Sequence, residues 1–317
     1  MPAQQKRLDV AVILAFLAIY LVWGTSFFAI RIAVHEVPPV FAAGTRFFLA
    51  GLLLYGFMRA TGTPRPSAIE WRGLSLLAVL MFVGDYAPLF WAEKYVPSGI
   101  ASILAATIPL LTVAIETFLF RRQPFQPRLI AATLLGFAGV AILLLPSRNQ
   151  SLPVIPCLAI LAGSTLWSFG GVLNRSLKLP ASRPLTSGAS MLAGGAGLLI
   201  LSGLCGELHP FPHVSLRAAL ALLYLIVFGS ILAFTAYVFL LARMPATRVA
   251  SYAYVNPVVA VALGYFLARE PINLRMIAGA ALVLISVYLI LNQPKQPVTS
   301  AQANTRPEGE TGLKQTP

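Results

Sequence analysis

Long apolar runs separated by short polar turns dominate this chain. Ten runs reach the length of about 20 mainly apolar residues that a membrane-spanning helix needs. Prolines break the chain in the turns between them, as at Pro38-Pro39 and Pro97. The pattern predicts an all-α integral membrane protein with ten transmembrane helices. Their expected limits are Val10 to Ala33, Val40 to Met58, Leu74 to Trp91, Ile100 to Phe120, Leu129 to Leu145, Val154 to Leu173, Thr186 to Leu204, Leu220 to Leu241, Val249 to Leu267 and Ile277 to Leu291.

The composition supports a membrane protein and argues against nucleic acid as a partner. Hydrophobic residues make up 58% of the 317 residues and charged residues only 10%, against roughly a quarter in soluble domains. The net charge is +13, but the basic residues are scattered between apolar runs and form no block or stripe. Residues 294–317 are rich in Pro, Thr, Gln and Glu, and we expect a disordered tail there.

The sequence contains two copies of one unit. The run Ile100 to Pro124 and the run Ser251 to Pro271 each carry a proline in the middle of an apolar helix, at Pro109 and Pro257. Arg122, Pro124 and Arg128 recur as Arg269, Pro271 and Arg275 at a constant offset of 147. We therefore divide the chain into repeats 1–146 and 147–293. Each repeat holds five helices, an odd number, so the second must enter the membrane upside down, as in many secondary transporters.

The positive charges predict which side of the membrane each loop faces. With the N-terminus inside, the inner segments hold sixteen Lys and Arg residues and the outer segments hold six. Cytoplasmic loops carry the excess of positive charge, so both termini and the tail are expected in the cytoplasm.

Three segments resemble the EamA-type permeases of the drug/metabolite transporter superfamily. They are YLVWGTSFFAIRIAVHEVPPVFAAGTRF, VPSGIASILAATIPLL and SYAYVNPVVAVALGYFLAREP. The resemblance covers nearly all of residues 8 to 293. It implies a ten-helix fold around a central cavity, a bacterial inner-membrane location, and export of amino acids, other small metabolites or toxic compounds. Halves of the family often end their fourth helix in Gly-Glu. The second copy here has Arg269-Glu270, and the first has Arg122-Gln123.

The two mid-helix prolines are the first candidate site positions. Proline removes one backbone hydrogen bond and frees the carbonyl four residues earlier, here at Ala105 and Ala253. Bends at Pro109 and Pro257 could then shape a cavity, or they could serve helix packing alone. The register shared by both copies favours the cavity.

Polar and aromatic residues within the runs are candidate cavity residues. Tyr252 and Asn256 lie one helical turn apart and share a face, which could bind a polar ligand or bond to a neighbouring helix. Trp23 and Trp167 each stand thirteen residues into their helix, too deep for interfacial anchors, and they are expected to line the cavity or to pack beside Gly24 and Gly170. Further candidates of lower weight are Thr25, Ser26 and Ser168.

Charges inside the apolar runs are costly, at about 2.5 to 3.5 kcal/mol each, and usually face a partner or water. Arg46 and Asp85 lie at similar expected depth, so they could form a structural salt bridge. Alternatively, Asp85 could carry protons while Arg46 binds a substrate carboxylate or phosphate. Glu93 could guard the outer mouth, or pair with Lys94 in solvent.

Signatures of enzymes, cofactors and metals are missing from the sequence. The three histidines fall in outer loops, and no phosphate-binding glycine loop with lysine occurs. The two cysteines lack metal-ligand spacing. We expect a secondary transporter that works by alternating access, needs only a monomer, the bilayer and a small-molecule substrate, and uses proton exchange as a candidate energy source. The alternative is a membrane sensor or scaffold that keeps the fold without transporting.

Overall fold

The computed structural model describes residues 2–121, 127–145, 152–174, 176–208, 214–241, 243, 249, 251–270 and 272–291, and the described residues contain helices and no strand. Seven helices in this part of the chain are long and apolar enough to span a membrane, and three shorter apolar helices accompany them. The predicted all-α membrane protein is therefore confirmed. The predicted tail and the division between the repeats at residue 146 lie outside the described residues.

The first repeat contributes α1 Pro2–Leu17, η1 Ala18–Val22, α2 Trp23–Val34, α3 Pro39–Ala60, α4 Ala68–Leu77, η2 Ala78–Val83, α5 Gly84–Ala92, α6 Ser98–Ala105, α7 Ile108–Ala114, η3 Ile115–Leu119 and α8 Pro127–Leu144. The second contributes α9 Val154–Asn174, α10 Arg183–Leu204, α11 Leu216–Tyr224, η4 Leu225–Leu232, α12 Ala233–Leu241, α14 Tyr252–Ala268 and α15 Leu274–Leu291. The η segments are short π-helical stretches within longer helices, such as the continuous span Ala68–Ala92.

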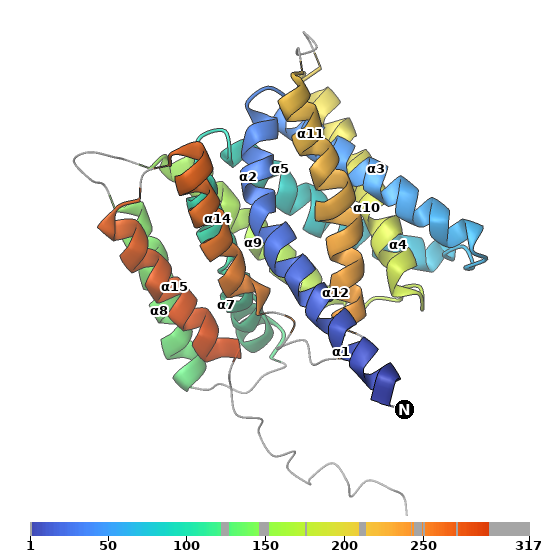
Figure 1. Ribbon diagram of the computed structural model, residues 1–317, viewed down its shortest axis with the longest axis horizontal. Helices are drawn as coiled ribbons and strands as arrows, with labels where there is room; N and C mark the ends of the chain where they lie inside the picture. Colours follow the sequence, from blue (N-terminus) through green and yellow to red (C-terminus); the bar gives the residue numbers. More distant parts are fainter. Residues whose placement is uncertain are drawn as a thin grey trace, which may run out of the picture.

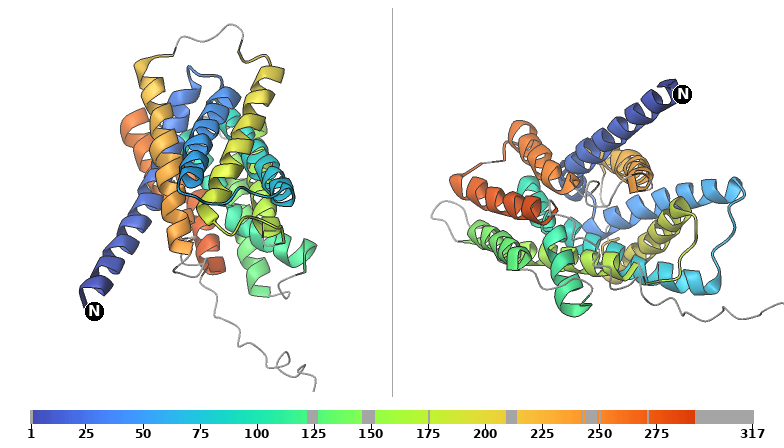
Figure 2. Two further views of the ribbon diagram at one scale, coloured as in Figure 1. Left: turned by 90° about the vertical axis from the view of Figure 1, so that its right-hand side faces the viewer. Right: turned by 90° about the horizontal axis from the view of Figure 1, so that it is seen from below.

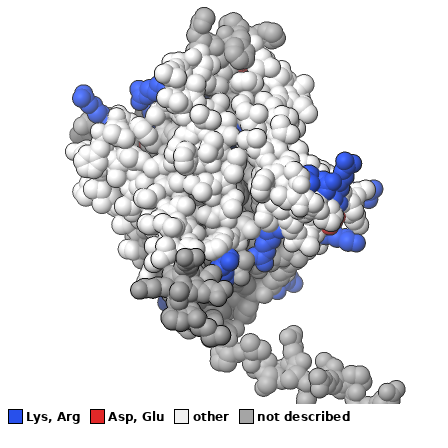
Figure 3. Space-filling model, turned by 45° about the vertical axis from the view of Figure 1, so that its right-hand side comes forward, with Lys and Arg blue, Asp and Glu red and all other residues white. Residues whose placement is uncertain are grey.

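The helices form one bundle in which helices from the two halves of the chain interleave (Figures 1 and 2). α3 packs along α10, α8 along α15, and α5 along α9, while α14 contacts both α2 and α6. The start of α1 and the end of α15 lie at the same end of the bundle, the lower end in Figure 1. Lys and Arg side chains lie mainly along the margins of the face in Figure 3, and most of its central area is uncharged, which suits contact with lipid.

Glycines allow α3 and α10 to approach backbone to backbone. A Cβ atom on Gly51 would overlap the backbone of Leu192, and one on Gly195 would overlap the backbone of Phe48. Small residues at helix contacts are the usual device for close packing in membranes. Gly188 and Gly195 of α10 thus face a helix of the same chain.

The fourth predicted helix is interrupted, whereas the ninth is not. α6 ends at Ala105 and α7 begins at Ile108, with Pro109 in its first turn. Proline suits the first turn because its missing N–H has no partner there. α14, in contrast, continues through Pro257 as one helix. The two prolines therefore occupy different local structures in the two repeats.

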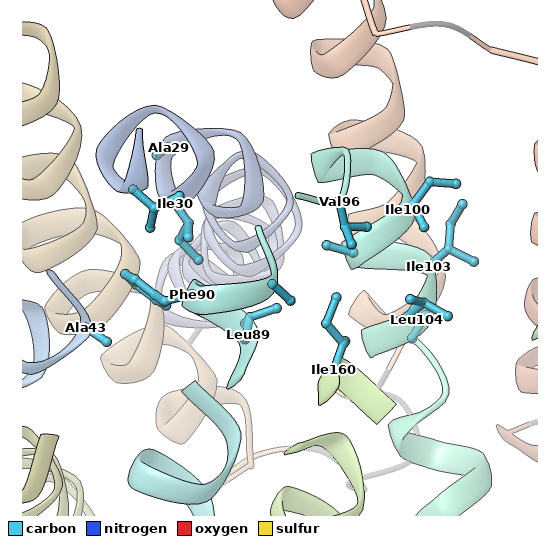
Figure 4. Close-up of a cluster of buried hydrophobic side chains, with 14 of the residues drawn as sticks. Ala29, Ile30, Ala43, Leu89, Phe90, Val96, Ile100, Ile103, Leu104 and Ile160 are labelled. Carbon is cyan, nitrogen blue, oxygen red and sulfur yellow. The ribbon is translucent and has the colours of Figure 1, made fainter. Parts of the chain in front are cut away.

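A cluster of buried aliphatic and aromatic side chains joins several helices near the centre of the bundle (Figure 4). Ile30 of α2, Leu89 of α5, Leu104 of α6 and Ile160 of α9 belong to this core. Helices distant in sequence are thereby held around one central region.

Carboxylates at the upper end of the bundle in Figure 1 cap helices of the opposite repeat. Glu207 accepts hydrogen bonds from the first backbone amides of α3, and Glu36 accepts from Ser215, the residue before α11. Glu270 accepts from the first amides of α6. Each carboxylate satisfies amides that lack partners within their own helix and complements the positive end of its dipole. These bonds connect the repeats at this end.

Candidate functional site

The described residues line a partly open central cavity of about 120 Å³ to which both halves of the chain contribute. Its walls come from α2, α3, α5, α6 and α7 of the first repeat and from α9, α12 and α14 of the second. The volume exceeds roughly tenfold the minimum needed to hold one water molecule. The predicted residues that line it are Trp23, Ser26, Arg46, Asp85, Pro109, Trp167, Tyr252, Asn256 and Pro257. Ala105 and Ala253, which precede the prolines by four residues, line it too.

Trp23 is fixed in the wall by a cluster of aromatic rings from the second repeat. Its indole Nε1 donates a hydrogen bond to the carbonyl oxygen of Gly229 at 3.1 Å. Its ring centroid lies 5.5 Å from that of Phe234, 5.3 Å from that of Tyr237 and 4.8 Å from that of Tyr252. These edge contacts are favourable because ring edges are positive and ring faces negative. One side of the cavity is therefore a rigid aromatic surface.

Trp167 has the reciprocal arrangement, since it contacts rings of the first repeat. Its ring lies 5.8 Å from Tyr86 and 6.3 Å from Phe82, between centroids. The neighbouring glycines serve helix packing, because a Cβ on Gly170 would lie 2.6 Å from Met81 and one on Gly24 would lie 2.7 Å from Val259. Both predicted interpretations thus describe part of the structure: the rings line the cavity and the adjacent glycines form helix contacts.

Arg46 brings a charge into the cavity wall. Its residue exposure is 2%, and its Nε donates to Ser230 Oγ at 2.9 Å. The guanidinium carbon lies 4.7 Å from the ring centroid of Phe47 and 5.5 Å from that of Tyr86, distances at which aromatic faces attract a cation. Nη1 has no hydrogen-bond partner among the described residues. The side chain is held in place but retains an unused donor.

Asp85 also lines the cavity but does not pair with Arg46. Arg46 and Asp85, both of which are described, form no ion pair with each other, so of the two alternatives for these residues the structural salt bridge is not present in this structure. The physical reason is that Arg46 turns toward Ser230 of η4, whereas Asp85 lies against α9. A Cβ on Gly163 of α9 would stand 3.0 Å from Asp85 Oδ1, so glycine makes room for the carboxyl.

Asn256 connects α14 to the first helix as well as lining the cavity. With its amide oriented by the surrounding acceptors, the nitrogen donates to the carbonyl oxygens of Tyr20 and Tyr252, each at 3.2 Å. Tyr20 lies in the π-helical turn η1, where the regular backbone ladder is disturbed. The hydrogen bond from Asn256 to a neighbouring helix, which the sequence allowed as the alternative to ligand binding, is therefore present.

Thr25, Ser168 and Glu93 are not among the residues that line the cavity. Thr25 Oγ1 bonds to Tyr224 and to carbonyls of its own helix. Ser168 Oγ donates to the carbonyl of Ser164 at 2.8 Å and lies 3.1 Å from that of Ile108. Glu93 is fully buried beyond the cavity, so its predicted pairing in solvent with Lys94 is wrong.

Sequence reasoning missed two groups of residues. Tyr86, Ser102 and Ser164 line the cavity, but an aromatic or a serine in an apolar run gives no signal that separates cavity from core. Arg31 and Glu270 form an ion pair, with 3.2 Å between Nε and Oε1. The acidic residue that ends the fourth helix of the second repeat was the available signal for this pair. Its partner in the other repeat could not be read from spacing.

A binding site for metal is not found in the described part of the chain, where no group of three His, Cys, Asp or Glu residues converges. The described cysteines, Cys157 and Cys205, are unpaired. The cavity therefore offers aromatic surface, one cation, one carboxyl and a few hydroxyls. Such walls can hold and orient an amphipathic molecule.

Comparison with known proteins agrees with this architecture. The sequence profile of the EamA-like transporter family matches residues 10–145 and again 154–292. The chain is 36% identical over 292 residues to the uncharacterized inner membrane transporter YedA of Escherichia coli (strain K12), covering 90% of this chain and 94% of that protein. It is 28% identical to a probable amino-acid metabolite efflux pump of Salmonella typhimurium, covering 86% of this chain and 92% of the relative.

A solved structure shares the fold. That crystal structure aligns with a TM-score of 0.61 and 23% sequence identity, covering 89% of this chain and 96% of its own. The family profile matches each half of the sequence once, and the two matches together span nearly all of its helical part. The repeated apolar runs, the helical bundle and these matches lead to one conclusion: the chain belongs to the EamA-like transporter family.

Proposed function

We propose that this protein is a secondary transporter of the inner membrane that exports small amphipathic metabolites, amino acids among them, through the central cavity by alternating access. The observation that carries the proposal is the unused Nη1 donor of buried Arg46 in the wall of a cavity shared by both repeats. A buried donor without a partner costs about 1–3 kcal/mol. A substrate that supplies the missing acceptor would recover that energy when it binds.

Alternating access requires two halves that can rock about a common axis, and the helix contacts support this. Numbering the ten proposed spans in order, the second packs on the seventh (α3 on α10) and the fifth on the tenth (α8 on α15). The first also packs on the eighth (α2 on α11), and the third on the sixth (α5 on α9). Exchange of the two repeats leaves this set of pairs unchanged, as a pseudo-twofold axis would require. We infer ten spans in two inverted repeats, with both termini in the cytoplasm.

The chemistry of the walls supports a substrate with an anionic group and an apolar body. Arg46 offers a charge-assisted bond to a carboxylate, and the rings of Trp23, Trp167 and Tyr252 offer apolar surface. Asp85 and Ser164 lie elsewhere on the same wall, and Ser164 Oγ has no partner among the described residues. They are suited to an ammonium or another donor on the same molecule. Together these groups fit a zwitterion.

A single chain is sufficient for this mechanism, because one chain supplies every described wall of the cavity. A dimerising scaffold would need a lipid-facing stripe of small residues. The glycines Gly188 and Gly195 of α10 instead contact α3 of the same chain. The scaffold alternative therefore gains no support from α10.

Transport into proteoliposomes tests the proposal. The panel consists of labelled amino acids with large apolar side chains, the corresponding amides that lack a carboxylate, and apolar cations. Wild type is compared with Arg46→Gln and with the matched control Arg217→Gln, which changes an exposed arginine. We expect flux of the carboxylates, reduced roughly tenfold or more by Arg46→Gln alone, because a bond to a charged group contributes about 1.5–3 kcal/mol.

The contrary results are equally specific. Folded wild type that moves no compound of the panel above empty liposomes would overturn transport itself. Equal flux of carboxylates and amides, unaffected by Arg46→Gln, would overturn the role of Arg46 and leave transport standing. A pH gradient imposed across the liposomes, with and without Asp85→Asn, separates proton exchange through Asp85 from facilitated diffusion.

A further inference from the structure

Glu93 is a buried carboxyl with no described partner. It follows the last residue of α5, its residue exposure is 0%, and neither Oε1 nor Oε2 has a hydrogen-bond partner among the described residues. An ionised carboxylate without partners is among the most costly groups to bury, whereas the protonated form carries no charge to desolvate. The surroundings of Glu93 in this structure therefore suit a protonated carboxyl.

Arg31 lies next to this carboxyl but is engaged elsewhere. Its Nε pairs with Glu270 Oε1 at 3.2 Å. Its Nη1 donates to the backbone carbonyl oxygens of Glu93 and Val96, at 2.9 and 2.6 Å. The other charged groups whose fields reach the Glu93 carboxyl are Glu270 and Arg46. Lys94, the next residue in the chain, is exposed.

Glu270 in turn holds the start of α6. Its carboxylate accepts hydrogen bonds from the backbone amides of Ser98 and Gly99, and from Ser98 Oγ at 3.1 Å. Arg31, Glu270 and Ser98 thus tie α2, the end of α14 and the start of α6 together. We name these three residues the latch.

The latch and Glu93 lie directly beyond the cavity. Ile30 precedes Arg31, Leu89 stands one turn before Glu93, and Ser102 stands one turn after Ser98, and all three line the cavity. Movement of the latch residues would therefore move the cavity wall at that end. Under the topology proposed above, this end faces the outside of the cell.

We propose that Glu93 is a proton-binding site and that release of its proton to the outer solution draws Arg31 from Glu270 and opens the latch. The deprotonated Glu93 carboxylate needs a cation, and Arg31 is already bonded to the backbone of the same residue. Glu270 without Arg31 would be left as a second anion close by, so its hold on α6 weakens. Protonation of Glu93 from outside restores the arrangement seen here.

This inference rests on the proposed function and adds to it a gate that responds to the pH of the outer solution. The outward-open state would release substrate, then gain a proton at Glu93 from the outer solution and close. Because this proton is released to and regained from the same outer solution, Glu93 gates the outer mouth and carries no proton across the membrane. Glu93 differs from Asp85 in this respect, because Asp85 lines the cavity itself and Glu93 lies outside it.

Infrared difference spectroscopy of the protein in nanodiscs tests the proton site without reference to any substrate. Titration in the Asp85→Asn background, which removes the buried carboxyl of the cavity wall, should reveal the carbonyl stretch of a protonated carboxyl that disappears as pH rises. Glu93→Gln should lack this band, whereas Glu36→Gln, which changes an exposed glutamate, should keep it. A band that persists in Glu93→Gln, or no such band in wild type at any pH, would overturn the proposal.

Thiol labelling tests the latch. Ala105→Cys places a thiol on α6 in the cavity wall, in a background with exposed Cys205 changed to Ser and buried Cys157 retained. The probe is a membrane-impermeant maleimide added from outside. If the loss of one proton is linked to opening, the equilibrium constant for opening should rise about tenfold per pH unit around the transition, and the labelling rate should rise with it. The Glu93→Gln variant carries the same thiol at Ala105→Cys. Its labelling rates therefore measure how pH alone changes the maleimide reaction, and the wild-type rates are divided by them.

Two further outcomes decide the case. Glu270→Gln removes the anion that holds Arg31, so its labelling should be fast at every pH. Labelling with the same pH profile in wild type and Glu93→Gln, or slow labelling in Glu270→Gln, would refute the latch. Because neither assay measures flux, failure of the latch is distinguishable from failure of transport.

Discussion

Gly51 and Gly56 lie on the same helix and offer a controlled test of the contact between α3 and α10. A Cβ on Gly51 would overlap the backbone nitrogen of Leu192, whereas a Cβ on Gly56 meets no atom within 4 Å. Backbone atoms cannot turn aside as a flexible side chain can. The two helices must therefore separate when Gly51→Ala is introduced.

The magnitude follows from the packing that this separation removes. Overpacking a closely packed contact typically costs about 1–3 kcal/mol. A gap of about 0.5–1 Å also forfeits a quarter to a half of each dispersion contact along the interface. We expect Gly51→Ala to lower the free energy of unfolding by about 2 kcal/mol or more, and Gly56→Ala to change it by less than about 0.5 kcal/mol.

Reversible unfolding by sodium dodecyl sulfate in mixed micelles, followed by tryptophan fluorescence, measures this difference. The two variants add the same single methyl group to the same helix, so effects of composition and of helix propensity nearly cancel. Because Arg46 stands on α3, transport should fall with stability in Gly51→Ala. Equal unfolding midpoints for the two variants would refute the backbone contact.

Three further outcomes follow from individual side chains. Arg46→Met should change the free energy of unfolding by less than about 1 kcal/mol while abolishing carboxylate transport. The cost of about 2.5–3.5 kcal/mol for placing the Arg46 charge in the membrane is offset in the wild type by the bond to Ser230 and by the aromatic rings, so the two contributions are lost together. A large loss of stability in mixed micelles would contradict this. Trp23→Phe removes one hydrogen bond to η4 and should cost about 0.6 kcal/mol, measured by the same unfolding titration. Hydrogen bonds from Ser215, first from its side chain and then from its backbone amide, lower the pKa of Glu36 below 4.5. The ionised Glu36 carboxylate therefore stabilises the start of α11 at pH values above the pKa that Glu36 has in the unfolded chain. This stabilisation is lost as pH falls through the lower pKa that Glu36 has in the folded protein. Hydrogen exchange of the α11 amides should accelerate in acid in wild type, whereas Glu36→Gln should show little such pH dependence.

Much of the helical organisation was predictable from the sequence because the bilayer imposes a length and an apolar composition on every spanning helix. The predicted run Val154 to Leu173, for example, corresponds to α9 Val154–Asn174. The prolines and aromatic residues also marked the cavity well. Pro109, Trp23 and Trp167 line it because polar, bulky or helix-breaking residues are retained in lipid mainly where they are useful.

The partners of the charged residues were decided only by the tertiary structure. Arg46 meets Ser230, 184 positions away, and Arg31 meets Glu270 in the opposite repeat. Residue spacing determines which side chains share a face of one helix, but it does not determine the rotation and depth at which that face meets another helix. One residue along a helix turns the side chain by about 100°. For this reason the sequence alone identified the family, the apolar helices and the candidate charges, whereas only the packed bundle separated Arg46 from Asp85 and brought Glu93, Arg31 and Glu270 together.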